Sequence, residues 1–237
     1  MRSRTPPFTP RIREPGATAV IAIDGPAASG KSSTAHWVAE RLGFRHIDSG
    51  ALYRAATAAA MRTDSAGGWT EHVVLEAARD VRLRPNRTSF VAAIGDEPID
   101  AEIRDAVVTQ HVSHVAKMPR VRQWVNDVVR RTARGCDVVV DGRDIGTVVF
   151  PDADLKVFLV ADPWERARRR LTQRLERSPT DEEIAEETER LVQRDSRDAT
   201  QTVQASDAVL IDTTYLTQEE QVERIVTLAR VVLKREG

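Results

Sequence analysis

The sequence predicts a doubly wound α/β fold, in which helices cover both faces of a parallel sheet. Three observations predict it. An apolar strand at 18–23 leads through a glycine-rich turn directly into a helical pattern. The segments 137–140 and 155–160 are continuously apolar, which suits strands buried on both faces. Strand and helix patterns also alternate along most of the chain. In such folds ligands bind at the carboxyl ends of the strands, so we expect the functional residues there.

The turn after the first strand has the spacing G-x-x-x-x-G-K-[ST] between a strand and a helix, which is typical of a phosphate-binding loop. Its glycines let successive N–H groups point at phosphate oxygens, and the positive end of the next helix faces the same anion. Lys31 can reach the β- and γ-phosphates, and the Ser32 hydroxyl can bind Mg²⁺. The alternative is a glycine-rich turn with an incidental lysine. The predicted nucleotide-binding residues are Gly25, Pro26, Ala27, Ala28, Ser29, Gly30, Lys31, Ser32 and Ser33.

The elements that follow suggest an insertion in the core. A helix at 30–42 stops at Gly43, and a strand at 45–47 precedes helices at 51–61 and 70–79. Strands at 80–84 and 88–94 form a predicted hairpin, followed by a turn at 95–98. A helix at 101–118 ends at Pro119, and another covers 121–134. We therefore expect core segments 18–62 and 119–237 around a small α+β module at 63–118.

The core then resumes. After the strands at 137–140 and 155–160, Pro163 suits the first turn of a helix that reaches about residue 177. Thr180 and Glu183 have capping-box spacing, and so have Thr217 and Glu220. The first box predicts a helix to about residue 195, and the second a terminal helix at 218–235. A last strand is expected at 208–211.

Composition narrows the possible functions. The 237 residues are 41% hydrophobic and 30% charged, which is typical of an ordinary globular protein. The formal net charge of −1 gives no overall electrostatic attraction to nucleic acid or to an anionic membrane. The single cysteine, Cys136, excludes an internal disulfide framework and a cysteine-based zinc cluster, and it suits a reducing, cytoplasmic setting. No apolar run approaches the roughly 18 residues that span a bilayer.

Residues 1–17 contain four arginines and four prolines with little apolar content, which predicts a disordered basic tail. The tail lacks the apolar region of a secretory signal, and its prolines disfavour the amphipathic helix of a transit peptide. A weak electrostatic contact with nucleic acid is a further alternative.

Charged residues near strand ends are the other candidates. Asp141 ends an apolar strand, where an NTPase places a carboxylate that organises Mg²⁺; the alternative is an ordinary turn aspartate. Arg54 and Arg143 also follow strand ends and suit bidentate phosphate recognition, although either could be a surface arginine.

The helix at 163–177 carries six arginines, which form either a solvated face or a lid over the transferring phosphate. Acidic residues on the next helix disfavour a nucleic-acid stripe. Arg194, Asp195, Arg197 and Asp198 form either exposed ion pairs or a cluster that closes over substrate. The five histidines show no metal-ligand spacing and are interpreted as structural.

Several segments together resemble bacterial-type cytidylate kinases. They are IDGPAASGKSS (23–33), DSGALYR (48–54), SHVAKMPRVR (113–122), DGRDIGTVVFPDADLKVFL (141–159), QRDSRD (193–198) and DAVLIDTT (207–214). The resemblance implies a P-loop kinase core, a nucleoside-monophosphate-binding insert at about 63–118 and a helical lid at about 166–198. It implies transfer of phosphate from ATP with Mg²⁺ to CMP, with dCMP as second acceptor. It also implies a monomer without membrane or specific nucleic-acid partners.

The resemblance assigns roles to individual positions. Ser49, Tyr53 and Arg54 match residues that line the CMP site, with Arg54 on the phosphate. Ser113, Arg122 and Asp144 match positions that recognise cytosine, and Arg143 a phosphate-binding one. Arg194 and Asp198 match contacts on the sugar side of the nucleotide. Arg169 and Arg170 match lid arginines that face ATP, so the implied catalytic set is Lys31, Arg143, Arg169 and Arg170.

One departure from the family pattern stands at position 201, where a phosphate-clamping arginine is expected and the sequence has Gln201. Loss of a charge-assisted contact there would cost about 1.5–3 kcal/mol in the transition state. Arg197 is a possible substitute. Two alternatives therefore stay open: another small-molecule kinase of UMP or shikimate type, and an ATP-binding interaction protein with weakened turnover.

Overall fold

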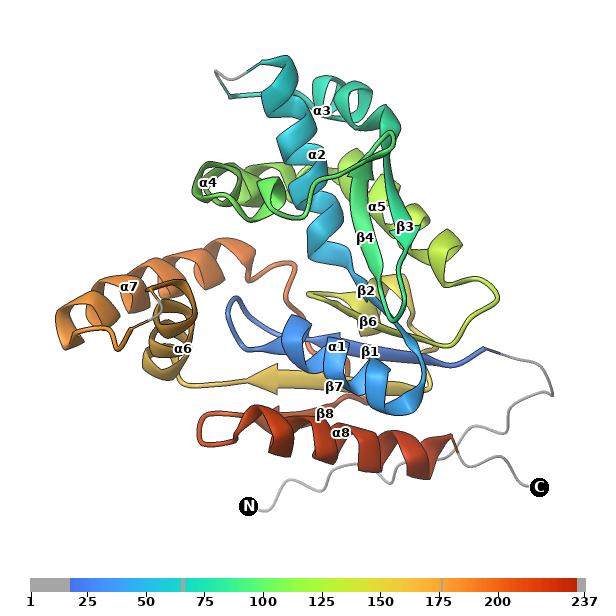
Figure 1. The fold of residues 1–237 in the computed structure, drawn as a ribbon, viewed down its shortest axis with the longest axis vertical. Helices are drawn as coiled ribbons and strands as arrows, with labels where there is room; N and C mark the ends of the chain where they lie inside the picture. The colour runs from blue at the N-terminus through green and yellow to red at the C-terminus, as the bar shows by residue number, and fades with distance from the viewer. Residues whose placement is uncertain (1–17, 65–66, 176, 234–237) are drawn as a thin grey trace.

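The computed structural model describes residues 18–64, 67–175 and 177–233; the predicted disordered tail at 1–17 lies outside them. Its centre is a five-stranded parallel sheet in the order β2-β6-β1-β7-β8 (Figure 1). The strands are β1 (Val20–Asp24), β2 (Arg45–Asp48), β6 (Val138–Gly142), β7 (Leu155–Val160) and β8 (Val209–Asp212). Almost every side chain of β1, β6 and β7 is buried, which explains why these strands read as continuous apolar runs.

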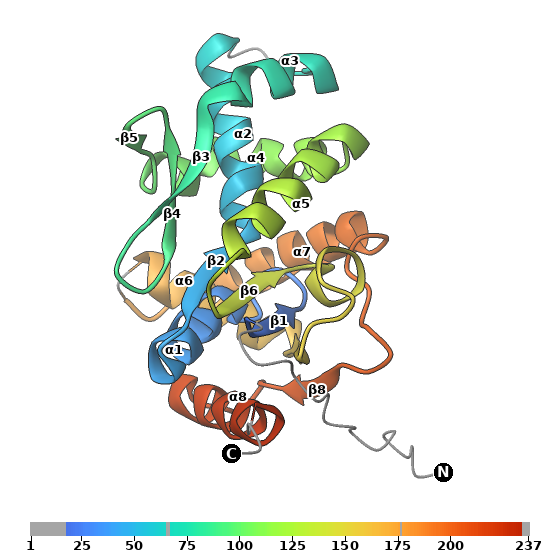
Figure 2. The same ribbon diagram turned by 90° about the vertical axis from the view of Figure 1, so that its right-hand side faces the viewer.

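Helices cover both faces of this sheet, so the predicted doubly wound fold is confirmed. On one face α1 (Lys31–Leu42) and α8 (Gln218–Val232) pack against Ile21, Val139 and Leu155. On the other face α2 (Ser49–Thr63) and α5 (Pro119–Ala133) pack against Ala22 and Val140. Figure 2 shows the sheet between these helices. The layers leave the carboxyl edge of the sheet open for a site.

A second, antiparallel sheet lies beyond the end of β2. It consists of β3 (Val81–Pro85), β4 (Phe90–Ile94) and β5 (Glu97–Pro98), with α3 (Glu71–Ala77) and α4 (Ala106–Val115) beside it. The β3–β4 hairpin is attached to the core edge, because the N–H of His46 in β2 donates to the carbonyl of Thr88 at 3.0 Å. The predicted hairpin is therefore present, and the division of the chain into a core and an inserted module stays a prediction, as does the role of that module.

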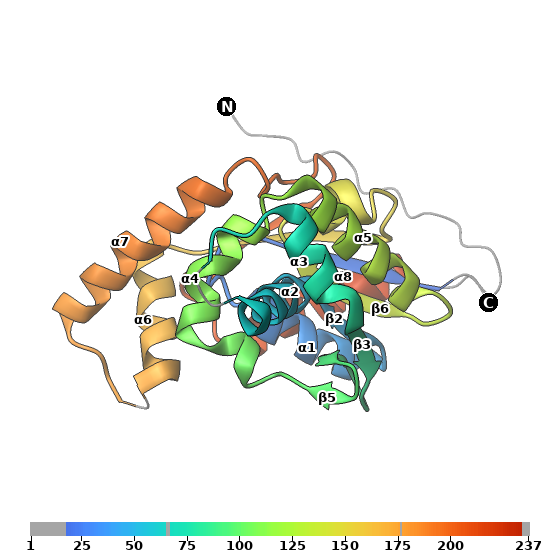
Figure 3. The ribbon, with the colours of Figure 1, turned by 90° about the horizontal axis from the view of Figure 1, so that it is seen from above.

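Helices α6 (Pro163–Leu175) and α7 (Asp181–Asp198) form a pair beside the carboxyl edge of the main sheet. The predicted capping box of Thr180 and Glu183 is present at the start of α7, and that of Thr217 and Glu220 at the start of α8. Figure 3 shows α7 running beside α4, so the helix pair and the inserted module approach each other from two sides.

Several element predictions were wrong in detail. The predicted turn at 95–98 contains the two-residue strand β5, which pairs with β4. The predicted helix at 101–118 is a 3₁₀ turn (Glu102–Arg104) and α4, separated at Asp105, whose side chain accepts from the N–H of Val107 at 2.7 Å. A π-helical turn (Ile145–Val149) after β6 was not predicted.

Candidate active site

The phosphate loop joins β1 to α1 in a conformation that requires its glycines. A Cβ on Gly25 would collide with the backbone carbonyl of Leu159 on β7, so only glycine fits. Gly30 precedes α1 with a left-handed φ of 86° and gives the helix no side-chain cap. The first N–H groups of α1 therefore stay available for an anion at the positive end of the helix.

Lys31 lies at the first position of α1 with 8% of its surface exposed. Its Nζ donates to the carbonyl of Pro26 at 2.9 Å, so the side chain folds back over its own loop. Burial, followed by the charge of Arg143, lowers the pKa of Lys31 to about 7. The nearby carboxylates of Asp141 and Asp48 oppose this lowering without cancelling it, so an incoming phosphate would further favour the charged amine.

Ser32 and Asp141 come together at the carboxyl edge of the sheet. The Ser32 hydroxyl donates to Asp141 Oδ2 at 2.5 Å, and Asp141 Oδ1 lies 2.7 Å from His46 Nε2. Burial alone would raise the pKa of Asp141, but the hydrogen bond and charge of His46 lower it overall. A hydroxyl and an ionised carboxylate side by side are hard oxygen ligands, which fits the Mg²⁺ role predicted for both residues.

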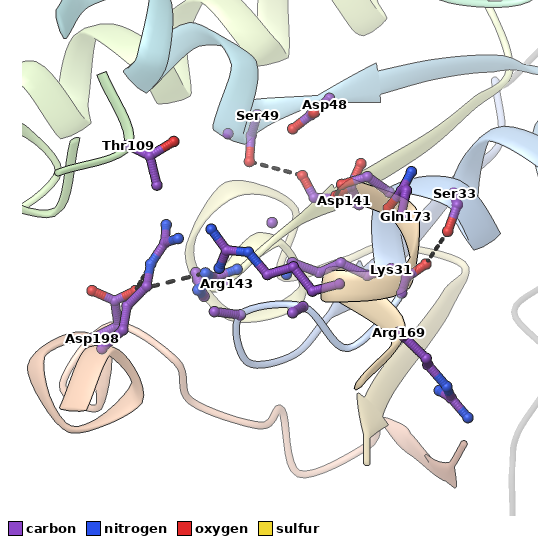
Figure 4. Close-up of a pocket in the computed structure, with 18 of the residues that line it drawn as sticks. Lys31, Ser33, Asp48, Ser49, Thr109, Asp141, Arg143, Arg169, Gln173 and Asp198 are labelled. Carbon is purple, nitrogen blue, oxygen red and sulfur yellow. Dashed lines mark hydrogen bonds and ion pairs between the residues drawn. The ribbon is translucent and has the colours of Figure 1, made fainter. Parts of the chain in front are cut away.

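Ser49, Tyr53 and Arg54 project from the start of α2. Asp48 caps this helix by accepting from the N–H of Ala51 at 3.1 Å, which places all three at its first turns. Ser49 Oγ donates to the carbonyl of Asp141 at 2.8 Å, as Figure 4 shows. Arg54 Nη1 donates to Thr109 Oγ1 of α4 at 2.8 Å, and burial lowers the pKa of Arg54. This guanidinium therefore lies where the core meets the inserted module.

Arg122 and Asp144, both assigned to base recognition by resemblance, form an ion pair. Arg122 Nη1 also donates to the carbonyl of Ala116 and to Gln201 Oε1, both at 3.1 Å. The guanidinium lies 5.9 Å from the ring centre of Tyr53. Burial raises the pKa of Asp144, and Arg122 opposes this rise. Gln201 thus contacts the base-recognition pair through Arg122.

Arg143 and Arg194 flank the buried carboxylate of Asp198. Arg143 Nη2 lies 3.6 Å from Asp198 Oδ2, an interaction drawn in Figure 4, and Arg194 Nε lies 3.7 Å from the same oxygen. Arg143 Nη1 donates to the carbonyl of Gly25 at 3.3 Å, which connects this cluster to the phosphate loop. Burial and the neighbouring Arg143 lower the pKa of Arg194 to about 10. The cluster has two cations for one anion.

The two predicted lid arginines diverge. Arg170 Nε lies 3.3 Å from Oε1 of the buried Glu187 on α7. Arg169 Nη2 donates to the carbonyls of Thr213 and Thr214 at 2.6 and 2.8 Å, so its guanidinium is directed at the segment after β8. Figure 4 shows Arg169 pointing away from Ser49 and Asp141. In this conformation Arg169 does not converge with Lys31.

A single cleft of about 1260 Å³ unites these groups. Lys31 and Ser32 of the phosphate loop line it, and so do Arg54, Arg143 and Asp144. Of the predicted site residues, which all lie in the described part of the chain, Gly25, Pro26 and Ser29 are absent from its walls. Ser113 on α4 is 9% exposed and also lines the cleft. The phosphate loop and the residues predicted to hold the acceptor therefore line one cleft.

Sequence reasoning missed three groups at this edge, of which Asp24 and His46 are buried and Asp48 is half-buried. Asp24 accepts from the N–H groups of Ile145 and Gly146 at 2.9 and 2.8 Å, and burial raises its pKa to about 6. Asp48 is paired in register with Asp141, and burial together with that charge raises the pKa of Asp48. His46 was interpreted as structural, yet it contacts the predicted Mg²⁺ ligand. Asp24 and Asp48 end strands just as Asp141 does, and that signal could have identified them.

Two features are absent from the described residues. No helix among them is long and apolar enough to cross a membrane. Within the same residues, no group of three or more His, Cys, Asp or Glu side chains could hold a metal ion by itself. A cation at Ser32 and Asp141 would therefore need oxygen ligands from a bound phosphate and water, as Mg²⁺ usually has.

Comparison with known proteins identifies the family. Residues 21–231 match the family model described as cytidylate kinase. A cytidylate kinase of Geobacillus kaustophilus is 44% identical over 213 residues, which cover 88% of this chain and 95% of the relative. A cytidylate kinase of Caldanaerobacter subterraneus is 42% identical over 225 residues, which cover 92% of this chain and 98% of the relative. The resemblance found in the sequence is confirmed, and the chain belongs to the cytidylate kinase family of nucleoside monophosphate kinases.

Proposed function

We propose that the protein transfers the γ-phosphoryl group of MgATP to CMP, with dCMP as a second acceptor. The observation that carries the proposal is the cleft, because the phosphate loop with Lys31 lines it together with Arg54, Arg143 and Asp144. In the reaction a phosphate oxygen of CMP forms a bond to the γ-phosphorus, and the bond from that phosphorus to the β–γ bridging oxygen breaks. CDP and ADP are the products.

The acceptor oxygen is already ionised near neutral pH, so the protein needs no general base. Its residues contribute positioning and charge neutralisation. Lys31 holds the β- and γ-phosphates of the donor, and Arg54 and Arg143 hold the phosphate of the acceptor. Arg194 lies beside Arg143 and offers a further positive charge toward the same region.

Ser32 and Asp141 would hold Mg²⁺, which supplies charge neutralisation at the donor phosphates. His46 and Ser49 keep Asp141 in place, since one binds its carboxylate and the other its backbone carbonyl. Helices α6 and α7 would act as the lid, and the module between residues 67 and 118 would hold the monophosphate. Closure of the lid would exclude water and limit wasteful hydrolysis of ATP.

Preference for cytosine would come from Asp144, Arg122 and Ser113. Together they offer an acceptor for the exocyclic amine of cytosine and donors for its carbonyl. A base with a different pattern of donors and acceptors leaves buried polar groups of the site unpaired, and this strongly lowers kcat/KM for that base.

A coupled assay of ADP release tests the proposal with CMP, dCMP, UMP and AMP as acceptors. We expect turnover with CMP and dCMP and little with the other two. Preference for UMP or AMP would replace the proposed acceptor. Tight ATP binding without turnover on any acceptor would point to the interaction protein instead.

A further inference from the structure

Both backbone polar groups of one residue in the phosphate loop, Ala27, are held by the helix pair. Arg166, on α6, donates through Nη1 to the carbonyl of Ala27 at 2.8 Å and to Asp195 Oδ2 at 2.6 Å. Asp195, on α7, accepts through Oδ1 from the N–H of Ala27 at 3.1 Å. We call these three residues the Ala27 clamp.

The guanidinium of the clamp is buried, whereas the side chain of Asp195 is 24% exposed. Arg166 is 4% exposed, and a charge so deeply buried is tolerated only when it is paired and hydrogen-bonded. Ala27 itself packs in a small apolar cluster with Leu171 of α6 and Leu191 of α7. The loop and the two helices therefore share one apolar core in addition to the polar contacts. A shift of the helices would displace the loop, because the core is closely packed.

The residue after the clamp has an unusual backbone. Ala28 has a left-handed φ of 57°, the sole non-glycine residue with positive φ in the described segments. Side chains disfavour this conformation, so something must hold it. Ala27, whose N–H and carbonyl are both held, immediately precedes it, and Gly30 and Lys31 follow two and three residues later.

We propose that Arg166 and Asp195 are positioning residues that set the shape of the phosphate loop and couple it to α6 and α7. The clamp commits the N–H of Ala27 to Asp195, so the loop offers its later N–H groups and Lys31 to the donor phosphates. It also connects the donor site directly to the helices that carry Arg169, Arg170 and Arg194. The inference rests on the proposed function for the identity of the donor, ATP.

The two carboxylate oxygens and the guanidinium have separable tasks, which conservative variants can distinguish. Asp195→Asn keeps an oxygen for the N–H of Ala27 but loses the charge that pairs with Arg166. Asp195→Ala loses both. Arg166→Lys keeps the charge, and Arg166→Met loses it together with the donor to Ala27. Glu186→Gln is the matched control, because Glu186 forms an exposed ion pair with Arg190 on α7 away from the loop.

The experiment measures the Kd of MgATP by titration calorimetry without acceptor, the KM of ATP and of CMP with kcat, and the thermal midpoint. We expect Asp195→Ala and Arg166→Met to raise the Kd and KM of ATP by about ten- to a hundredfold, with an unchanged KM of CMP. Asp195→Asn and Arg166→Lys should recover part of the loss, and Glu186→Gln should match the wild type.

The proposal is overturned if the variants lower only the thermal midpoint, or if the KM values of ATP and CMP rise equally. If the alanine and methionine variants fail to fold, a wild-type Kd of ATP in both conservative variants overturns it as well. Absence of transfer to CMP in the wild type would refute the proposed function alone, because the Kd of ATP still tests the clamp.

Discussion

Gln201 offers the sharpest test of how the acceptor site works. The family pattern implies an arginine that clamps phosphate at this position, whereas the structure shows a glutamine whose Oε1 accepts from Arg122 at 3.1 Å. Arg122 in turn pairs with Asp144. We therefore expect Gln201 to act by fixing Arg122 in the base-recognition region, and expect its replacement by alanine to weaken use of CMP.

The size of the effect follows from the contact. A hydrogen bond between a charged donor and a neutral amide contributes about 1.5–3 kcal/mol. Arg122 retains its bonds to Asp144 and Ala116, and its side chain is 19% exposed, so the lower end applies. About 1.5 kcal/mol corresponds to about a tenfold loss in kcat/KM for CMP. In Gln201→Arg the two guanidinium groups would repel by up to about 4 kcal/mol at 4 Å and an effective dielectric constant of 20.

The assay compares kcat/KM for CMP among the wild type, Gln201→Ala and Gln201→Arg. Gln204→Ala is the control, since Gln204 is exposed in the same segment. We expect both changes at 201 to reduce kcat/KM and the control to leave it unchanged. A Gln201→Arg enzyme that surpasses the wild type would refute the reasoning, because position 201 would then act on phosphate as the family pattern implies.

Three further variants and one proton measurement test the donor site and the base region. Lys31→Met should reduce the rate of phosphoryl transfer at least about a hundredfold in the ADP assay. Its thermal midpoint, measured by calorimetry, should stay the same or rise, because the variant removes a buried ammonium. Burial lowers the pKa of Lys31 to about 7, so its amine is mostly neutral at pH 8, and the phosphates of MgATP should cause it to bind a proton. Calorimetric titration in buffers of different ionisation enthalpy should show this proton uptake at pH 8 and its loss near pH 6, where the amine is already protonated. Asp144→Ala should reduce the preference for CMP over UMP by about ten- to a hundredfold without changing the Kd of ATP, and equal losses on both acceptors would contradict its role. Asp141→Asn should raise the Mg²⁺ concentration needed for half-maximal rate, and an unchanged Mg²⁺ dependence would exclude it as a ligand.

The elements that could be predicted from the sequence are those specified by local chemistry. The strand Leu155–Val160 and both capping boxes were predicted at their observed places, because a buried run and a cap depend on neighbouring residues only. The strand β5 was missed because two residues form a strand only through pairing with β4. The break of the helix predicted at 101–118 depends on one side chain, Asp105, which turns back to cap α4.

The same division holds for the site. The phosphate loop and Asp141 are contiguous motifs and could be found along the chain. The contact of His46 with Asp141 and the clamp around Ala27 join residues far apart in sequence, and Ala27 is 168 positions from Asp195. No periodicity or spacing encodes such contacts, so only the folded chain reveals them.

Burial and the charges that line the cleft explain why the pKa values of its cationic residues are lowered. Burial lowers the pKa of Lys31 and of Arg194, and each is further lowered by the charge of Arg143. Buried cations that lower one another's pKa reduce the stability of the fold, and enzymes often retain such unfavourable groups where function requires them. Two phosphorylated substrates would supply the missing negative charge at this point. Under the proposed function, the stability lost to these buried cations would be recovered as affinity for the phosphates of the substrates.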